Sequence, residues 1–375
     1  MSAPTGTDDQ VLVRRHHQLL PSPVPLRFLD EDGNEVDEHG GYDAPDPAVA
    51  LDTWRQMVIG RRLDAQATAL ARQGRLAVYP SSEGQEACQV GTVLALRRTD
   101  WVFPTYRDTV AVLTRGVAPA EALGLLRGTR HCGYDPTAHA VAPQTTPLAT
   151  HAVHAVGYAY GCARLGDDTV ALALVGDGAT SEGDFHEALN LAGVLGAPVI
   201  FVVQNNRYAI SVPLARQTGA PLLADRGIGY GIPGEQVDGN DALAVLAVVG
   251  AAAARAREGG GPSLIEAHTY RLAAHTNADD ASRYQDEAEV ATWRRRDPLP
   301  RLEAWLRSGG LLDDALAASI REDAERAAAE LRSALAVPEE LDPRTLVDHV
   351  YARPTPGLAE QRARLGAEAV SAVGA

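Results

Sequence analysis

The chain has 375 residues, of which 45% are hydrophobic and 22% are charged. This balance is typical of a folded globular protein, and the length suits one large domain or two ordinary ones. Lys and Arg number 34 against 49 Asp and Glu, giving a net charge of −15. Because phosphates and anionic lipids repel such a protein, neither nucleic acid nor a membrane is expected as a partner.

Cysteine usage and the N-terminal sequence bear on the compartment. Cys88, Cys132 and Cys162 are widely spaced and form no C-x-x-C pair, which favours a reducing environment. The first ten residues lack a secretion signal, and no apolar run is long enough to span a bilayer. We therefore expect a cytoplasmic protein.

The N-terminal region is expected to pack loosely. Residues 1–25 contain four prolines and no periodicity, which predicts a flexible arm. Residues 26–46 are expected to form a short extended segment. Within it the turn pair Asp32-Gly33 predicts a small hairpin.

Residues 47–310 are predicted to form one α/β domain. Apolar residues recur at helical spacing from Pro47 to Gln73. Four short apolar runs predict strands buried on both faces, at 101–103, 169–175, 199–203 and 263–267. Because helical patterns lie between these runs, we expect a doubly wound, largely parallel sheet flanked by helices, with ligands beyond the carboxyl ends of the strands.

The C-terminal region is predicted to be helical. Helical spacing recurs over 290–306, 312–335 and 357–370. Residues 311–375 are therefore expected to form helices that pack on the same domain.

Two of the predicted strands end in polar residues. The first is followed by Gly176-Asp177-Gly178 and the second by Gln204-Asn205-Asn206, with a helix predicted between them over 184–195. One βαβ crossover places Asp177 and Asn206 at the same edge of the sheet. Mg²⁺ prefers about six oxygen ligands, often carboxylates, amides and substrate phosphates. The glycines would let a diphosphate approach, and the start of the following helix would favour that anion.

This arrangement resembles the signature of thiamine diphosphate enzymes, G-D-G followed by N-N at about this spacing. The resemblance implies the thiamine-diphosphate-binding fold. It also implies that Asp177 and Asn206 ligate magnesium by side chain and that Tyr208 does so by its backbone carbonyl.

Further segments resemble the α chains of 2-oxo acid dehydrogenases, from about residue 26 to the end. They include PTYRDTVAVLTRG (104–116), TTPLATHAVHAVG (145–157), GDGATSEGDFHEALN (176–190) and YRLAAHTNADDASRY (270–284). The cofactor-binding residues that the resemblance implies are Tyr106, Arg107, Thr146, Leu148, Gly176, Asp177, Gly178, Ala179, Asn206, Tyr208, Arg271 and His275.

The resemblance assigns different parts of the cofactor to these residues. Tyr106, Arg107, Arg271 and His275 would bind the diphosphate, for which the planar fork of Arg is well suited. Thr146 and Leu148 would contact the two rings. His275 is also implied as a catalytic residue that assists acyl transfer to lipoamide, because imidazole titrates near neutral pH.

The chain departs from some relatives at three positions. Thr276 follows the loop histidine where several animal relatives have a regulatory serine, so kinase control is not expected. Gln204 replaces an arginine, which removes one cation near the diphosphate. His151 replaces a glutamine near a family potassium site, so potassium is not predicted.

The resemblance implies oxidative decarboxylation of a 2-oxo acid and transfer of the acyl group to the lipoyl group of a dihydrolipoyl acyltransferase. The carboxylate that activates the cofactor comes from a separate β chain in this family. The chain is therefore expected to be inactive alone and to work in an α2β2 heterotetramer. A small-residue face on a predicted helix suits either a subunit interface or an interior contact, and consists of Ala152, Ala155, Ala159 and Ala163.

Branched-chain substrates are favoured by the likeness of 26–36, 74–87 and 275–284 to branched-chain α subunits. Pyruvate is the alternative, because pyruvate enzymes share the same magnesium motif. A non-catalytic assembly scaffold is a more remote alternative, disfavoured by the intact Asp177, Asn206, Arg271 and His275. A nicotinamide-dependent enzyme is disfavoured because no G-x-G-x-x-G follows a strand.

Overall fold

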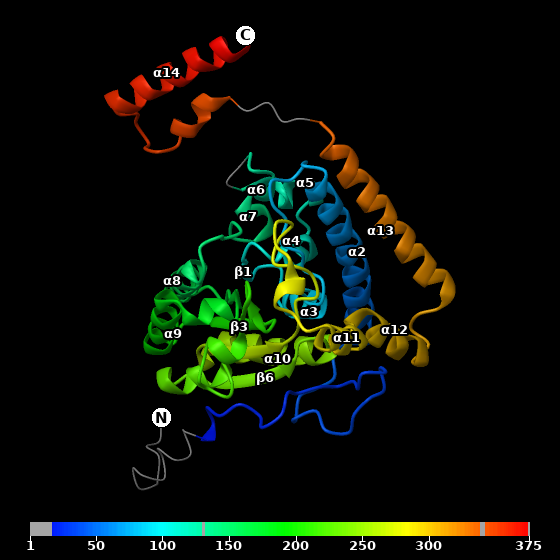
Figure 1. Ribbon diagram of the computed structural model, residues 1–375. Coiled ribbons are helices and arrows are strands. Elements are labelled where there is room, and N and C mark those ends of the chain that lie inside the picture. Colours follow the sequence, from blue (N-terminus) through cyan, green and yellow to red (C-terminus); the bar gives the residue numbers. More distant parts are fainter. Residues whose placement is uncertain (1–16, 130–131, 338–341, 374–375) are drawn as a thin grey trace. The chain divides into compact units, whose positions relative to one another are not determined.

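The computed structural model describes residues 17–129, 132–337 and 342–373 (Figure 1). It divides into two compact units, one reaching Ala334 and one starting at Leu335. The first unit contains the sheet and all the predicted site residues, and it is described first.

A five-stranded parallel sheet forms the centre of the first unit. In spatial order its strands are β1 (Trp101–Phe103), β2 (Ala171–Gly176), β3 (Val199–Asn205), β7 (Ser263–His268) and β6 (Gly234–Asp238). The register pairs Gly176 with Gln204 and Asn205 with His268. The residues that follow β2, β3 and β7 therefore emerge together at one edge.

Helices and short turns connect these strands. The helices of the first unit are α2 (Pro47–Arg72), α3 (Glu86–Leu94), α4 (Thr109–Thr114), α5 (Pro119–Ala122), α6 (Gly124–Arg127), α7 (Pro136–His139), α8 (Thr150–Arg164), α9 (Gly183–Leu195), α10 (Ala242–Arg255), α11 (Glu287–Arg295), α12 (Pro298–Ser308) and α13 (Asp314–Ala334). Short helical turns are η1 (Gly178–Ser181), η2 (Leu214–Arg216), η3 (Ala224–Tyr230), η4 (Ala256–Gly260) and η5 (Ala281–Arg283). A small hairpin pairs β4 (Tyr208–Ala209) with β5 (Val212–Pro213).

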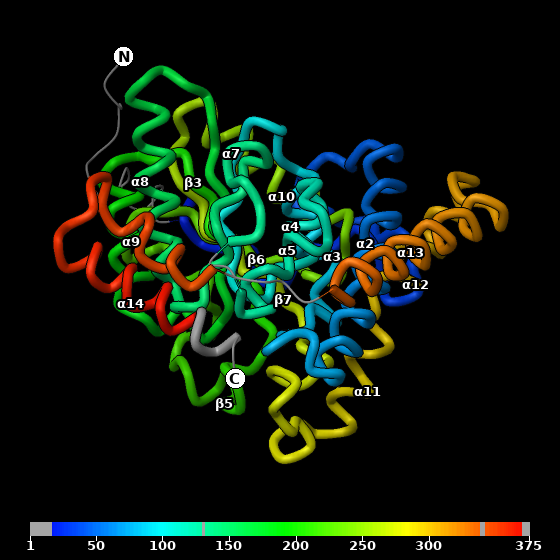
Figure 2. Tube along the Cα trace, turned by 90° about the horizontal axis from the view of Figure 1, so that it is seen from above, coloured from blue at the N-terminus to red at the C-terminus, as the bar shows by residue number. Residues whose placement is uncertain are grey.

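The sheet lies between two helical layers, as Figures 1 and 2 show. Alternate side chains of each strand face opposite layers. Leu172, Leu174 and Ile200 pack in a core with residues of α2, α3, α4 and α10. Ala173 and Phe201 pack in a second core with residues of α8 and α9. Burial on both faces explains why these strands read as continuous apolar runs, and it confirms the predicted fold class.

The predicted strands and the long first helix are confirmed. Asp46 starts α2 by accepting a hydrogen bond from Ala48 N at 2.8 Å, and Pro47 occupies the first helical turn. The sequence did not indicate β6, because its segment GEQVD is polar and lies at the edge of the sheet.

The N-terminal segment is hydrogen-bonded to the edge of the sheet where it is described. Residues 1–16 lie outside the described part of the chain, but residues 17–25 run along β6. Ser22 donates from its amide and its hydroxyl to Glu235, at 2.9 and 2.6 Å, and Gly234 N donates to Leu19 O at 3.1 Å. The predicted small hairpin is confirmed by the antiparallel pairing of Leu29 with Glu35.

The helical region after the sheet differs from the prediction in one respect. The stretch predicted over 290–306 consists of two helices, because Asp297 and Pro298 end one helix and start another. Helix α13 packs along α2 and belongs to the first unit, which reaches Ala334.

The second unit consists of the turn η6 (Pro343–Val347) and the helix α14 (Pro356–Val373). An ion pair of 2.7 Å between Arg362 and Asp348 joins them. That this unit packs on the α/β domain stays a prediction.

Candidate active site

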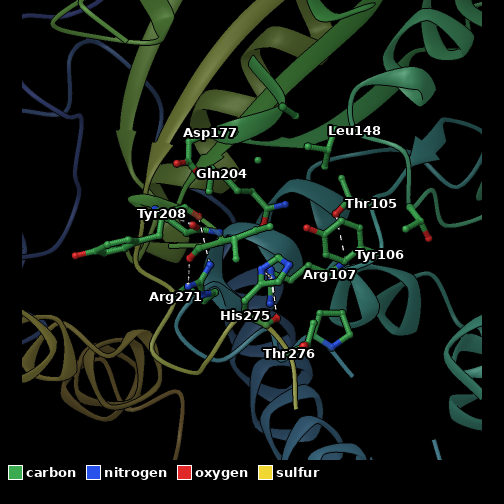
Figure 3. Close-up of a pocket in the computed structure, with 18 of the residues that line it drawn as sticks. Thr105, Tyr106, Arg107, Leu148, Asp177, Gln204, Tyr208, Arg271, His275 and Thr276 are labelled. Carbon is green, nitrogen blue, oxygen red and sulfur yellow. Dashed lines mark hydrogen bonds between the residues drawn. The ribbon is translucent and has the colours of Figure 1, made fainter. Parts of the chain in front are cut away.

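A cavity of about 540 Å³ opens at the carboxyl edge of the parallel sheet (Figure 3). Its volume lies within the usual range for a small-molecule site. Its walls come from the segments that follow β1, β2, β3 and β7. All twelve residues that the sequence singled out line it: Tyr106, Arg107, Thr146, Leu148, Gly176, Asp177, Gly178, Ala179, Asn206, Tyr208, Arg271 and His275.

Three oxygen atoms converge at the sheet end of this cavity. The amide oxygen of Asn206 lies 3.3 Å from Asp177 Oδ1 and 3.0 Å from the carbonyl oxygen of Tyr208. Adjacent ligands of an octahedral Mg²⁺ are separated by about 3 Å, given bonds of about 2.1 Å. Both separations from the Asn206 oxygen therefore fit adjacent ligands of such an octahedron.

The orientation of the Asn206 amide depends on what the site holds. Its nitrogen donates to Gln85 Oε1 at 3.0 Å, and its oxygen accepts from Tyr208 N at 3.3 Å while facing Asp177 Oδ1 and the Tyr208 carbonyl oxygen. Exchanging the two atoms would let the nitrogen donate to Asp177 and Tyr208, which suits a site without a cation. Three acceptor oxygens that face one another repel, and the arrangement becomes favourable when a cation lies between them. Burial raises the pKa of Asp177, and a bound cation would oppose that shift.

The backbone on either side of Tyr208 adopts an unusual conformation. Arg207 and Ile210 have φ values of 76° and 56°, a left-handed conformation that costs a side-chain-bearing residue about 1–3 kcal/mol. Both flank the β4 segment, which carries Tyr208 and approaches Gly178. A Cβ atom on Gly178 would lie 2.7 Å from that of Ala209. Gly178 is therefore required by this approach, whereas Gly176 faces open space.

Arg107 and His275 lie side by side in the centre of the cavity (Figure 3). Arg107 Nη2 is 3.0 Å from His275 Nδ1 and donates to the His275 carbonyl oxygen at 3.0 Å. Its Nη1 donates to Ser81 O at 2.9 Å. Burial, followed by the charges of Arg107 and Arg271, lowers the pKa of His275 to about 4. His275 is therefore neutral at pH 7, with Nδ1 as an acceptor for Arg107.

Arg271 is fully buried beneath the β4–β5 hairpin. Its guanidinium donates to Ile210 O and to Tyr284 Oη, each at 2.7 Å, and to Tyr208 O at 3.3 Å. These bonds tie the loop after β7 to the segment that presents the Tyr208 carbonyl. Arg271 also adds positive charge to the cavity. Of the buried residues that line the described cavity, Asp177 is the one with a carboxylate.

The cavity also has an open, apolar rim. Leu148 and Ile210 are 39% and 56% exposed, and Thr146 is also exposed. Val78, which is also exposed, completes this rim, and the buried Leu126 lines the wall beneath it. The polar end is therefore closed by this chain, while the apolar end is not.

Comparison with known proteins identifies the family. Residues 54–337 match the family model described as "Dehydrogenase E1 component". The chain belongs to this family. It is 46% identical over 345 residues to 3-methyl-2-oxobutanoate dehydrogenase subunit alpha of Mycobacterium tuberculosis, covering 92% of this chain and 94% of that protein. It is 39% identical over 341 residues to pyruvate dehydrogenase E1 component subunit alpha of Staphylococcus epidermidis, covering 90% and 91%.

Membership of the E1 component family confirms the resemblance drawn from the motifs. Among the described residues, no three His, Cys, Asp or Glu side chains cluster in a way that could hold a metal ion. The three converging oxygens come from one carboxylate, one side-chain amide and one backbone carbonyl, so they are not a cluster of that type. No helix in the described part of this E1 chain is long and apolar enough to cross a membrane.

Two glutamines add unpaired polar atoms to the E1 site. Gln85 Nε2 and Gln204 Oε1 line the cavity and are buried without a hydrogen-bond partner in the described structure. Gln204 uses its nitrogen to bond Asp108 at 2.6 Å. Unpaired buried polar atoms are costly, so these two suit a polar ligand in the cavity. Gln204 was noted in the sequence only as a lost cation, and Gln85 was missed because its local sequence is not distinctive.

A buried carboxylate outside the cavity is linked by hydrogen bonds to the centre of the site. Asp64, within α2, accepts hydrogen bonds from Tyr79 Oη at 2.7 Å, Ser81 Oγ at 2.6 Å and Ser82 N at 2.7 Å. The Ser81 carbonyl oxygen in turn accepts a hydrogen bond from Arg107 Nη1. Asp64 therefore positions Arg107, although the helical pattern of α2 gave no sign of such a role.

Two local expectations concern helices beside the cavity. The helix predicted over 184–195 is confirmed as α9, which starts at Gly183. The short turn η1 separates it from Asp177, and the expectation that its start favours an anion stays a prediction. Ala152, Ala155 and Ala159 are fully buried in the core between α8 and the sheet. These three form an interior contact, one of the two alternatives left open by the sequence, whereas Ala163 is exposed.

Proposed function

We propose that this chain is the α subunit of a branched-chain 2-oxo acid dehydrogenase, an oxidoreductase that acts with thiamine diphosphate and magnesium. The observation that carries the proposal is the convergence of three oxygens beside buried arginines at the end of the sheet. The identity of 46% to a 3-methyl-2-oxobutanoate dehydrogenase α subunit supports the substrate class.

Each residue of the polar end has a proposed binding role. Asp177, Asn206 and the carbonyl of Tyr208 would hold the magnesium ion. Tyr106, Arg107 and Arg271 would stabilise the diphosphate by their charge and by hydrogen bonds. Gly176, Gly178 and Ala179 would let the diphosphate approach the backbone after β2. Thiamine diphosphate would supply the electron sink that decarboxylation requires.

The central and apolar parts of the cavity would orient the reacting groups. Thr146 and Leu148 line the end where the rings of the cofactor would lie. His275, neutral beside Arg107, would serve as a proton acceptor or donor during acyl transfer to lipoamide. A bound diphosphate would raise its pKa, because the anion offsets the nearby arginines.

We also propose that the active site is completed by a β subunit, in an α2β2 heterotetramer that serves a lipoyl-bearing dihydrolipoyl acyltransferase. The exposed apolar rim supports this view, since exposed apolar patches often mark protein contacts. All three cysteines carry free thiols, in line with the proposed cytoplasmic location.

Pyruvate is the alternative substrate, supported by 39% identity to pyruvate dehydrogenase α subunits. The decisive experiment mixes the purified chain with its β subunit and measures decarboxylation of 3-methyl-2-oxobutanoate, 4-methyl-2-oxopentanoate and pyruvate. We expect no turnover by either subunit alone and the highest kcat/KM of the mixture for the branched acids. A preference for pyruvate would select the alternative, and no activity with any 2-oxo acid would favour a non-catalytic scaffold.

A further inference from the structure

Gln217 contacts the carboxylate of Asp177 from outside the cavity. Its Nε2 donates to Asp177 Oδ2 at 2.8 Å and to Val212 O at 2.9 Å. Because both partners are acceptors, the nitrogen of the amide must face them. The orientation of Gln217 is therefore fixed by two hydrogen bonds.

This contact leaves the two oxygens of Asp177 in different roles. Oδ2 is engaged by Gln217, while Oδ1 faces the amide oxygen of Asn206 at 3.3 Å. Asp177 is only 1% exposed, so its carboxylate has little room to rotate. A cation among the three oxygens would meet Oδ1 alone.

Gln217 and Tyr208 belong to one short, tied segment. Leu214 N donates to Arg207 O at 2.9 Å, which closes the β4–β5 hairpin, and Gln217 follows η2 directly. The same segment thus presents the Tyr208 carbonyl to the site and holds the far oxygen of Asp177. Gln217 Oε1 is also buried without a partner in the described structure, and a water bound to a cation is a donor of the kind it lacks.

The difference between one and two carboxylate oxygens matters for metal choice. Mg²⁺ demands a near-ideal octahedron and binds carboxylates through one oxygen, whereas Ca²⁺ takes six to eight oxygens and accepts both oxygens of a carboxylate. We propose that Gln217 is a positioning residue that enforces single-oxygen ligation by Asp177 and so selects Mg²⁺ over Ca²⁺. The inference rests on the proposed magnesium and thiamine diphosphate site.

The test measures cation selectivity in the full chain assembled with its β subunit. Thiamine diphosphate is held at a fixed concentration, and its binding is followed by calorimetry while Mg²⁺ or Ca²⁺ is titrated. Loss of an outer partner of a metal ligand typically lowers metal affinity about 10–100-fold. For Gln217→Met, which keeps the side-chain length but removes the donor, we expect that loss for Mg²⁺ and a much smaller change for Ca²⁺.

Two further variants separate selectivity from loop damage. Gln217→Glu keeps the size, cannot donate as a carboxylate and adds an oxygen ligand, so its preference should move further toward Ca²⁺. Thr218→Ala removes the neighbouring hydrogen bond to Ala220 N without touching Asp177, and it should keep the wild-type ratio of affinities.

The outcomes distinguish the inference from the proposed function. An unchanged ratio in both Gln217 variants, or equal losses for the two cations, overturns the selective role of Gln217. If wild type binds thiamine diphosphate without any need for a divalent cation, the proposed site fails, and the inference fails with it.

Discussion

The two ends of the cavity are built in different ways. At the sheet end Asp177 and Arg271 are 1% and 0% exposed, whereas Leu148 and Ile210 at the rim are 39% and 56% exposed. At the sheet end, this chain supplies the three oxygens, the positively charged arginines and the glutamine side chains. The rim has apolar side chains that face outward. The contrast supports the proposal that this chain supplies a complete site for a metal and a diphosphate, and only part of a catalytic site.

The difference follows from what positions each end. Asp177 and Asn206 are fixed by adjacent parallel strands in register, and Arg107 and Arg271 are held by backbone carbonyls. The rim side chains Leu148 and Ile210 are instead partly exposed to solvent. A substitution at the sheet end should therefore impair cofactor binding with or without the partner subunit. A substitution at the rim should lower activity only in the assembled enzyme.

The largest effect is expected for Asp177→Ala. This variant removes the single carboxylate of the proposed octahedron, so magnesium-dependent binding of thiamine diphosphate should be abolished, with or without the β subunit. Fluorescence or calorimetric titration measures it. Asp314→Ala, at a side chain that is 98% exposed, is the control and should bind normally. Unchanged affinity in Asp177→Ala would remove the metal site from the account.

His275→Ala tests the residue between the two ends. A positioned acid or base contributes about 10²–10⁴-fold, so the complete reaction with lipoamide should fall by that factor. Decarboxylation measured with an artificial electron acceptor should fall much less, because it bypasses lipoyl chemistry.

If His275 only binds the diphosphate, both assays would fall together and recover at high cofactor concentration. That result would assign His275 to the binding end of the cavity and withdraw its catalytic role.

A smaller, conditional effect is expected at the rim. Leu148→Ala should change the free energy of unfolding of the isolated chain by less than about 0.5 kcal/mol, as for most surface substitutions. In the assembled enzyme it should lower kcat/KM about 5–30-fold, the cost of truncating a buried interface contact. Equal behaviour of variant and wild type after assembly would mean that the rim stays open.

The smallest effect concerns the protonation of His275. Because burial and the arginines lower its pKa to about 4, against about 6.5 in the unfolded chain, the unfolded state binds more protons between these values. The contribution of neutral His275 to stability is thus present above pH 6.5 and is lost as the pH falls toward 4. Histidine NMR should show no titration of His275 between pH 5 and 8, and a higher midpoint once diphosphate is bound. A midpoint near 6.5 in the free protein would contradict the buried environment.

The sequence predicts the parts of the site that the sheet carries. Buried strands have a recognisable apolar pattern, and their ends bring Asp177 and Asn206 together whatever the intervening helix contains. Arg107 and His275 needed the family resemblance, because nothing in their local sequence brings two loops into contact. Gln85 and Gln217 were not predictable, since their roles depend on hydrogen bonds across more than one segment. The polar edge strand β6 was missed for the opposite reason, because it lacks the apolar pattern of a buried strand.

The most direct test of the central claim is a crystal structure of the full chain with its β subunit, thiamine diphosphate and Mn²⁺, whose anomalous signal locates the metal. We expect one peak within bonding distance of Asp177 Oδ1, the Asn206 amide oxygen and the Tyr208 carbonyl. The diphosphate should lie beside it, and the cofactor rings should reach a rim covered by the partner. A peak elsewhere, or a ring end enclosed by this chain alone, would contradict the account of a complete binding end and an incomplete catalytic one.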